Sequence, residues 1–263
     1  MKTIAYLYED DDILVCVKPA GMATEGSQLG CMDLVSALKT HLVRERKKYC
    51  RQNSEIVRAN TSQPYLALIH RLDQPVEGIL VFGKNKKAAA DLTRQLQSHK
   101  MQKDYLAVVV GTLQQTEGKC TDYLLRDHES GEVTIAGENI PQAQKAELTY
   151  QVIAQNTLPG KTDAAGIETV LSLVQIHLLT GRFHQIRAQM EHLGTPILGD
   201  HRFGDEKARL LAKEIGEDMV ALCSYRLGFR HPVTHKEVVY QITPSGMSFR
   251  MFQDRMQAEG VKA

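Results

Sequence analysis

The chain has 263 residues, of which 43% are hydrophobic, 24% charged and 6% aromatic. This composition is that of an ordinary globular protein and excludes a disordered, fibrous or disulfide-dense chain. Because 32 Lys and Arg face 31 Asp and Glu, the formal net charge is only +1. Any affinity for nucleic acid must therefore come from local basic patches rather than from a uniformly basic surface.

The cysteines and the apolar segments bear on location. The five cysteines are widely spaced and form no Cys-x-x-Cys pair, which argues against a disulfide framework and against a zinc clip. No apolar run approaches the roughly 20 residues that span a bilayer, and no secretory leader is recognised. We therefore expect a cytoplasmic protein that does not associate with a membrane.

The first half of the chain predicts short strands and two helices. Apolar runs at 4–8 and 13–17, separated by an acidic turn, predict an opening hairpin. The pattern then predicts a helix at 34–48, strands at 66–69 and 78–82, a helix at 86–98 and a strand at 105–110. Pro75 lies between the two middle strands, so residues 70–77 are expected to follow an extended or turning path at a strand end.

The second half is less regular. Residues 112–166 contain several Gly and Pro residues and predict hairpins and loops, with weakly defined strands near Tyr123 and Tyr150. The pattern then predicts a strand at 170–179, helices at 184–193 and 206–214, strands at 219–229 and 237–242, and a final helix from Ser245. Because no regular β-α-β alternation occurs, the fold class predicted is α+β.

Asp73 is the first candidate for chemistry. It lies in the charged segment 70–77 between two apolar strands, where a carboxylate is costly unless a cation or hydrogen-bond donors hold it. Enzymes place working acids in such environments. From its position alone, Asp73 could equally be a surface or helix-capping residue, or a partner of neighbouring Arg71.

A second candidate segment is Thr180–Arg187. A glycine turn there leads into a predicted helix whose first turns carry two arginines, a histidine and an amide. The positive end of a helix adds to these charges, so the segment suits a phosphate, or a carboxylate such as Asp73 held in its ionised form. A solvated basic helix face is the alternative.

Basic residues also cluster in two places. Residues 44–51 hold five Lys and Arg against one Glu, and residues 84–104 hold six against two Asp. Such clusters can bind a phosphate backbone without reading its sequence, although they can also be solubilising helix faces. Tyr105 follows the second cluster and could stack on an unpaired base or pack as a core aromatic.

The ten histidines make metal binding worth testing. His184, His192 and Asp200 would be the ligands of a metal-dependent hydrolase, but no His-Glu-x-x-His or Cys/His pair accompanies them, so we expect no metal. The glycine-rich motifs for nucleotides and the elbow of serine hydrolases do not occur either. Carboxylate chemistry beside arginines is the interpretation that these observations favour.

Six motifs, in order along the chain, resemble the RluA-like family of pseudouridine synthases, in the form without an N-terminal S4 domain. They are Tyr8–Val15 with Lys18–Gly21, His70–Asp73 with Gly78–Val81, Lys103–Ala107, Leu179–Arg187, Gly194–Asp200 and Leu227–Thr234. The resemblance implies one catalytic domain over residues 1–263, with 112–166 as its variable segment. It also implies a mixed, largely antiparallel central sheet with flanking helices and a catalytic cleft.

The resemblance further implies that a specific uridine in rRNA or tRNA is isomerised to pseudouridine. Asp73 would be the essential carboxylate, Tyr105 would pack on the target uracil, and Arg187 would pair with Asp73. The residues expected to contact RNA are His70, Arg71, Arg182, His184 and Gln185. Asp73 could attack C1′, attack the base or remove a ribose proton. None of these routes needs a cofactor, and we expect none.

The chain departs from the family pattern beside both candidate segments. Gln74–Glu77 replaces a turn that usually continues to Thr-Ser-Gly, and Phe183 replaces a small hydroxyl residue. We expect these changes to alter substrate preference rather than to abolish chemistry. The alternative is a non-catalytic RNA-binding or RNA-folding module on the same fold. No obligate protein partner is indicated, and we expect a monomer.

Overall fold

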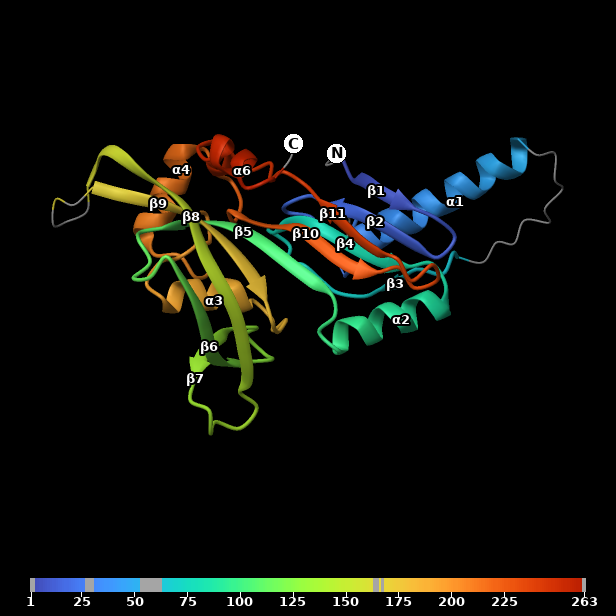
Figure 1. The fold of residues 1–263 in the computed structure, drawn as a ribbon, viewed down its shortest axis with the longest axis horizontal. Helices are drawn as coiled ribbons and strands as arrows, with labels where there is room; N and C mark the ends of the chain where they lie inside the picture. The colour runs from blue at the N-terminus through green and yellow to red at the C-terminus, as the bar shows by residue number, and fades with distance from the viewer. Residues whose placement is uncertain (1–2, 27–30, 53–62, 163–165, 167, 262–263) are drawn as a thin grey trace.

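The computed structural model describes residues 3–26, 31–52, 63–162, 166 and 168–261 (Figure 1). Its strands are β1 (Ala5–Glu9), β2 (Ile13–Lys18), β3 (Ala67–Leu68), β4 (Glu77–Gly83), β5 (Gln102–Val110), β6 (Glu117–Arg126), β7 (Val133–Ala136), β8 (Gln144–Thr162), β9 (Glu168–Leu178), β10 (Leu222–Arg230) and β11 (Glu237–Gln241). Its helices are α1 (Leu34–Gln52), α2 (Lys86–Gln97), α3 (Gln185–His192), α4 (Glu206–Ile215), α5 (Met247–Arg250) and α6 (Gln253–Ala258).

One eleven-stranded sheet runs through the molecule, and its main path is β1-β2-β4-β10-β5-β9-β8-β6-β7. The short strand β3 pairs with β4, and β11 pairs with β10. The β4–β10 pairing is parallel, and the other strand pairings of the described residues are antiparallel. The α+β class and the mixed, largely antiparallel sheet are therefore confirmed.

Strands β2 and β4 are buried along nearly their whole length, which shows that this part of the sheet is covered on both faces. Successive side chains of a strand point to opposite faces. Leu14 and Cys16 accordingly join the core that includes Leu34 and Leu38 of α1, whereas Ile13 and Val15 join the core that α2 covers. The continuous apolar runs that predicted strands are thus explained by burial on both sides.

Gly78 allows β4 and β10 to approach each other where the parallel pairing begins. Its φ is 151°, and a Cβ at this position would lie 2.5 Å from the Cβ of Ser224 on β10. Any side chain would therefore force the two strands apart. This close approach places the loop that precedes β4, and with it Asp73, directly beside the middle of the sheet.

Most predicted elements lie within a few residues of the observed ones, and the main difference is in residues 112–166. This segment was expected to consist mainly of loops and hairpins. Strands do run past Tyr123 and Tyr150, but β6 and β8 are long and belong to the main sheet, with β7 at its edge. Pairing of β8 with β9 supplies the register that the local sequence pattern lacks.

The C-terminal end differs as well. Two short helices, α5 and α6, replace the single helix expected from Ser245. Phe249, Phe252 and Met256 from this region are buried in the main core. No helix among the described residues is long and apolar enough to cross a membrane.

Candidate active site

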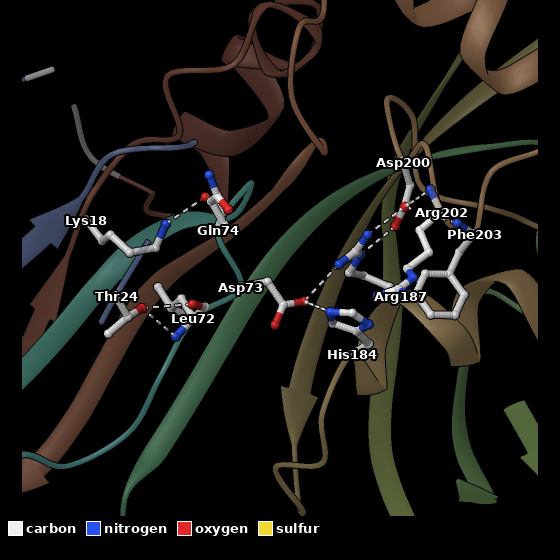
Figure 2. Close-up of polar contacts among 10 residues, drawn as sticks. All are labelled: Lys18, Thr24, Leu72, Asp73, Gln74, His184, Arg187, Asp200, Arg202 and Phe203. Atoms are coloured by element: carbon white, nitrogen blue, oxygen red, sulfur yellow. Dashed lines mark hydrogen bonds and ion pairs between the residues drawn. The ribbon is translucent and has the colours of Figure 1, made fainter. Parts of the chain in front are cut away.

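Asp73 lies where the loop before β4 faces the start of α3 (Figure 2). Its Oδ2 is 3.1 Å from Nη1 of Arg187 and 3.6 Å from Nε2 of His184. The Asp73 side chain is 21% exposed, whereas that of Arg187 is 6% exposed. The sequence placed this carboxylate beside this guanidinium, and the structure brings them together across 114 positions of the chain.

The loop that carries Asp73 is held through its main chain. Lys18 is fully buried, and its Nζ donates to the carbonyl oxygens of Met22 at 2.8 Å, Gln74 at 3.0 Å and Pro19 at 3.2 Å. A buried ammonium is costly unless hydrogen bonds satisfy it, and these carbonyls use its donors. The Thr24 hydroxyl adds a 2.8 Å bond to the carbonyl of Leu72. Both residues that flank Asp73 are thus tied down.

Arg187 is held from behind by Asp200, which is fully buried. Nε and Nη2 of Arg187 lie 2.7 and 2.8 Å from the two carboxylate oxygens of Asp200, a bidentate arrangement that fixes the guanidinium plane. The amides of Arg202 and Phe203 also donate to Asp200. Burial alone would raise the pKa of Asp200, but the bonds from Arg187 outweigh it and the pKa is lowered. Asp200 therefore positions the cation that faces Asp73.

The role of Asp200 differs from the one that the metal hypothesis gave it. Both of its oxygens bind Arg187, and His192 bonds through Nδ1 to Asp122 at 3.0 Å. Across the residues that the structure describes, no group of three or more His, Cys, Asp or Glu could hold a metal ion. The proposed ligand set of His184, His192 and Asp200 is therefore not assembled. An ion-pair role for Asp200 had no signal in the sequence beyond its place in a motif.

The ring of His184 lies beside Asp73, with Nε2 at 3.6 Å from Oδ2. This residue adopts the left-handed conformation, with φ of 55°, at the start of α3, and its ring stacks on Phe183 at 3.7 Å between centroids. Phe203 contacts the same ring edge-on at 5.6 Å. Burial lowers the pKa of His184 to about 4, and the Asp73 charge offsets this only in part. The imidazole is neutral near pH 7, and its Nδ1 has no hydrogen-bond partner.

Tyr105 lies on β5 and is 6% exposed. Burial raises the pKa of its phenol, and the charge of Asp73 raises it further. The phenol is thus protonated at neutral pH. A buried, uncharged ring close to the carboxylate is suited to packing against a base rather than to holding a negative charge.

The residues expected to contact RNA occupy different environments. The side chain of Arg71 is 63% exposed and only loosely paired with Glu25, at 3.4 Å. Arg182 is exposed and donates from Nε to a main-chain carbonyl at 3.0 Å. For His70, burial lowers the pKa to about 3, and its Nε2 has no hydrogen-bond partner. Arg71 and Arg182 are therefore the two that present charge to the solvent.

Gln185 is buried and occupied within the protein. Its Oε1 accepts bonds from the Thr180 hydroxyl and the Arg182 amide, and its Nε2 donates to Glu147 and Gln189. All four hydrogen-bonding positions of the amide are thereby used. The observed bonds give Gln185 a structural place in the turn before α3, whereas the sequence suggested contact with substrate.

A surface cleft of about 530 Å³ lies next to this site and shares Arg202 and Phe203 with it. Asp73 is not among its lining residues, which include three acids, Glu132, Glu191 and Asp205. Because Arg202 is the one basic residue of this lining, the cleft does not suit a polyanion such as RNA. The site around Asp73 and this neighbouring cleft are therefore separate features.

The sequence matches the family model described as RNA pseudouridylate synthase over residues 12–192. The tRNA pseudouridine synthase C of Haemophilus ducreyi is 32% identical over 88% of this chain and 87% of its own length. That of Pasteurella multocida is 32% identical over 90% and 89%. The ribosomal large subunit pseudouridine synthase C of Haemophilus ducreyi is 29% identical over 88% of this chain but 63% of its own length.

Two solved structures have a similar fold. Human RNA Pseudouridylate Synthase Domain Containing 1 superimposes with a TM-score of 0.67 at 22% identity, over 92% of this chain and 84% of its own. Human RNA Pseudouridylate Synthase Domain Containing 4 gives 0.66 at 21% identity, over 98% and 94%. At such identities the likeness concerns the arrangement of the sheet and helices alone.

Proposed function

Because the chain belongs to the RNA pseudouridylate synthase family, we propose that Asp73 is the carboxylate with which it isomerises a uridine of tRNA to pseudouridine. The observation that carries this assignment is the 3.1 Å contact between Asp73 and Arg187, with Arg187 itself fixed by buried Asp200. A working carboxylate needs a defined position beside a cation, and this arrangement supplies it.

Arg187 places a fixed cation against Asp73. Its guanidinium is charged at neutral pH, and its Nη1 donates to Oδ2 of Asp73 at 3.1 Å. Pseudouridine formation breaks the bond between ribose C1′ and uracil N1 and makes a bond between C1′ and C5. The proton on C5 leaves and N1 gains one, so the reaction is an isomerisation that consumes no water. Asp73 can act in such a reaction as a nucleophile or as a base.

Tyr105 and Arg71 fit the handling of the nucleotide. The reacting atoms lie inside a base stack, so the uridine must be everted, at a cost of a few kcal/mol. We assign Tyr105, buried beside Asp73, to packing against the everted uracil. Arg71 is two residues from Asp73 and largely exposed, so its side chain can enter the space that the uridine leaves.

We favour tRNA over rRNA as the substrate. Both relatives at 32% identity bear the name tRNA pseudouridine synthase C, and this chain spans 87% and 89% of their lengths. The ribosomal large subunit pseudouridine synthase C is 29% identical. A cytoplasmic location and a monomeric state accord with this function and remain predictions.

The test is tritium release from tRNA transcripts labelled at uridine C5, with wild-type enzyme, D73N and a charge-matched control. We expect D73N to lose at least about 1000-fold in kcat, since it removes the reacting carboxylate. It should still bind tRNA, because it changes no basic residue. D254N, at exposed Asp254 on α6, should behave as wild type. Turnover by D73N at the wild-type rate would refute the assignment.

A further inference from the structure

Lys103 is a cation next to the candidate site that the function described so far does not use. It lies at the start of β5, where it pairs in register with Leu227 of β10. Side chains two apart on a strand share a face, so Lys103 points to the same side of the sheet as Tyr105. The two Cα atoms are separated by about 7 Å along the strand.

The ammonium of Lys103 lies beside the turn that leads into α3. A Cβ built on Gly181, in this turn, would lie 3.3 Å from Lys103 Nζ, so this glycine leaves the ammonium uncovered on that side. Burial lowers the pKa of His70, three residues before Asp73, and the charge of Lys103 lowers it further. Lys103 therefore lies beside the segment that carries Arg187, and its charge acts on the segment that carries Asp73.

Lys103 also differs from Arg187 and Arg71 in its ion-pair partners. Arg187 is paired with Asp73 and Asp200, and Arg71 with Glu25. In contrast, no carboxylate among the described residues lies within 4.0 Å of Lys103 Nζ. Burial lowers the pKa of Lys103, so its charge is partly desolvated without compensation. A partly dehydrated cation of this kind gains from an anionic ligand.

We propose that Lys103, with the Gly181 turn, binds a backbone phosphate directly flanking the uridine that Asp73 isomerises. This inference rests on the proposed function and deepens it. His70 stays neutral because it is buried beside Lys103, so this subsite carries one positive charge. One charge matches one phosphodiester. The short distance from Lys103 to Tyr105 along β5 limits the phosphate to a neighbour of the everted nucleotide.

The first test measures the salt dependence of tRNA binding with an unmodified tRNA transcript at several KCl concentrations. We expect K103Q to weaken binding by about tenfold at low salt and to lower the slope of log K against log[KCl] by about 0.7 to 0.9. K103R keeps the charge and should retain the slope. K213Q removes an exposed charge on α4, a helix joined to the end of β8 by the salt bridge between Glu214 and Lys161. It should also match wild type.

The second test locates the phosphate. A stem-loop RNA containing the uridine that the enzyme isomerises is prepared with a neutral methylphosphonate at one position at a time. Wild type should lose about tenfold in affinity at one flanking position, and K103Q should be insensitive to that same replacement. Equal sensitivity of both proteins at every position, or a K103Q slope equal to that of wild type, would overturn the inference. So would a K103R variant that behaves like K103Q.

These binding measurements do not depend on turnover. If D73N keeps its activity, the catalytic assignment fails while the Lys103 results remain interpretable. If K103Q binds tRNA as wild type does, the phosphate subsite fails while the role of Asp73 is untouched. The urea midpoint of K103Q, expected to be no lower than that of wild type, separates loss of the contact from loss of the fold.

Discussion

The two sides of the candidate site hold Asp73 and Arg187 in different ways. The carboxylate side, residues 18–24 and 70–77, fixes Asp73 through main-chain carbonyls that Lys18 and Thr24 bind. The arginine side, residues 180–203, fixes Arg187 through the side chain of Asp200 and the ring of Phe203. As long as Lys18 and Thr24 are kept, a side chain next to Asp73 can therefore change without moving Asp73. On the arginine side a change of side chain displaces the cation itself.

This difference explains the two departures from the family pattern. Gln74–Glu77 replaces the usual hydroxyl-containing turn, but Lys18 binds the carbonyl of Gln74, which every residue type has. Phe183 lies on the arginine side, where its ring stacks on His184 and carries the guanidinium of Arg126 at 4.1 Å. The first change is thus compatible with an unaltered Asp73. The second reshapes the wall of the pocket, and we expect it to bear on which RNA is accepted.

Among the variants that test this comparison, the largest effect is expected from D200N, which changes the side chain that binds Arg187. Asparagine keeps the shape but leaves the buried guanidinium without its bidentate partner, at a cost of about 3 kcal/mol in the free energy of unfolding. A displaced Arg187 should lower kcat/KM by about 100-fold. Urea unfolding and tritium release measure the two effects. D218N, at exposed Asp218, is the matched control and should change neither; a D200N enzyme with normal stability would contradict the comparison.

The next effect is expected from K18M on the carboxylate side. Methionine fills the space but leaves buried carbonyls without a donor, which costs about 2 kcal/mol in the free energy of unfolding. Because the loop carrying Asp73 loosens, kcat should fall while the Kd for tRNA stays the same. K213M on α4 is the matched control. If K18M lowered tRNA affinity and left kcat intact, Lys18 would act on RNA rather than on the loop.

The sequence predicted that Asp73 pairs with Arg187, but it did not predict the contacts that hold this pair in place. Asp73, Tyr105 and Arg187 stand in motifs that carry a family resemblance, and the element pattern placed each near a strand end or a helix start. The sequence offered Asp200 only as the end of a motif and as a ligand in the disfavoured metal alternative, because its bond to Arg187 depends on how the chain turns after α3. The sequence likewise did not show that the amide of Gln185 is buried and bonded within the protein. Partners of this kind are set by tertiary contacts, which a linear pattern does not contain.

The strands of residues 112–166 show the same limit on a larger scale. Local pattern indicated the strands near Tyr123 and Tyr150 but not their length or their membership of the main sheet. Their register is set by pairing with β9, whose apolar run was recognised from the sequence. A polar strand gains its conformation from the neighbour with which it pairs, so its own residues predict it poorly.

A change of pH is expected to have a smaller effect on stability, because each side of the candidate site contains one histidine that burial keeps neutral. Burial lowers the pKa of His70 to about 3, and that of His184 to about 4. As pH falls below the ordinary value of 6.5, the unfolded chain takes up these protons first, so stability is full above pH 6.5 and is lost towards pH 4. For His70 the loss by pH 5 is about 1 to 2 kcal/mol.

Urea unfolding at pH 7, 6 and 5 measures this dependence. H70Q removes one of the two titrating groups, so its stability should decline less steeply with falling pH than that of wild type. H128Q, at exposed His128, should follow the wild-type profile. If H70Q and wild type declined in parallel, the imidazole of His70 would be accessible to protons in the folded protein, contrary to its buried position.

The smallest effect is expected from Q74A, immediately next to the catalytic candidate. The Gln74 side chain is exposed, and its amide makes only a long contact of 3.4 Å with the carbonyl of Gly21. Alanine keeps the main-chain carbonyl that Lys18 binds, so the free energy of unfolding should change by less than about 0.5 kcal/mol, and kcat should stay near the wild-type value. F183A, at the same distance in sequence from His184 as Gln74 is from Asp73, removes a stacked ring and should cost more. If Q74A lowered stability or kcat more than F183A, the position of Asp73 would depend on its neighbouring side chains, as that of Arg187 does. The two sides of the candidate site would then be alike.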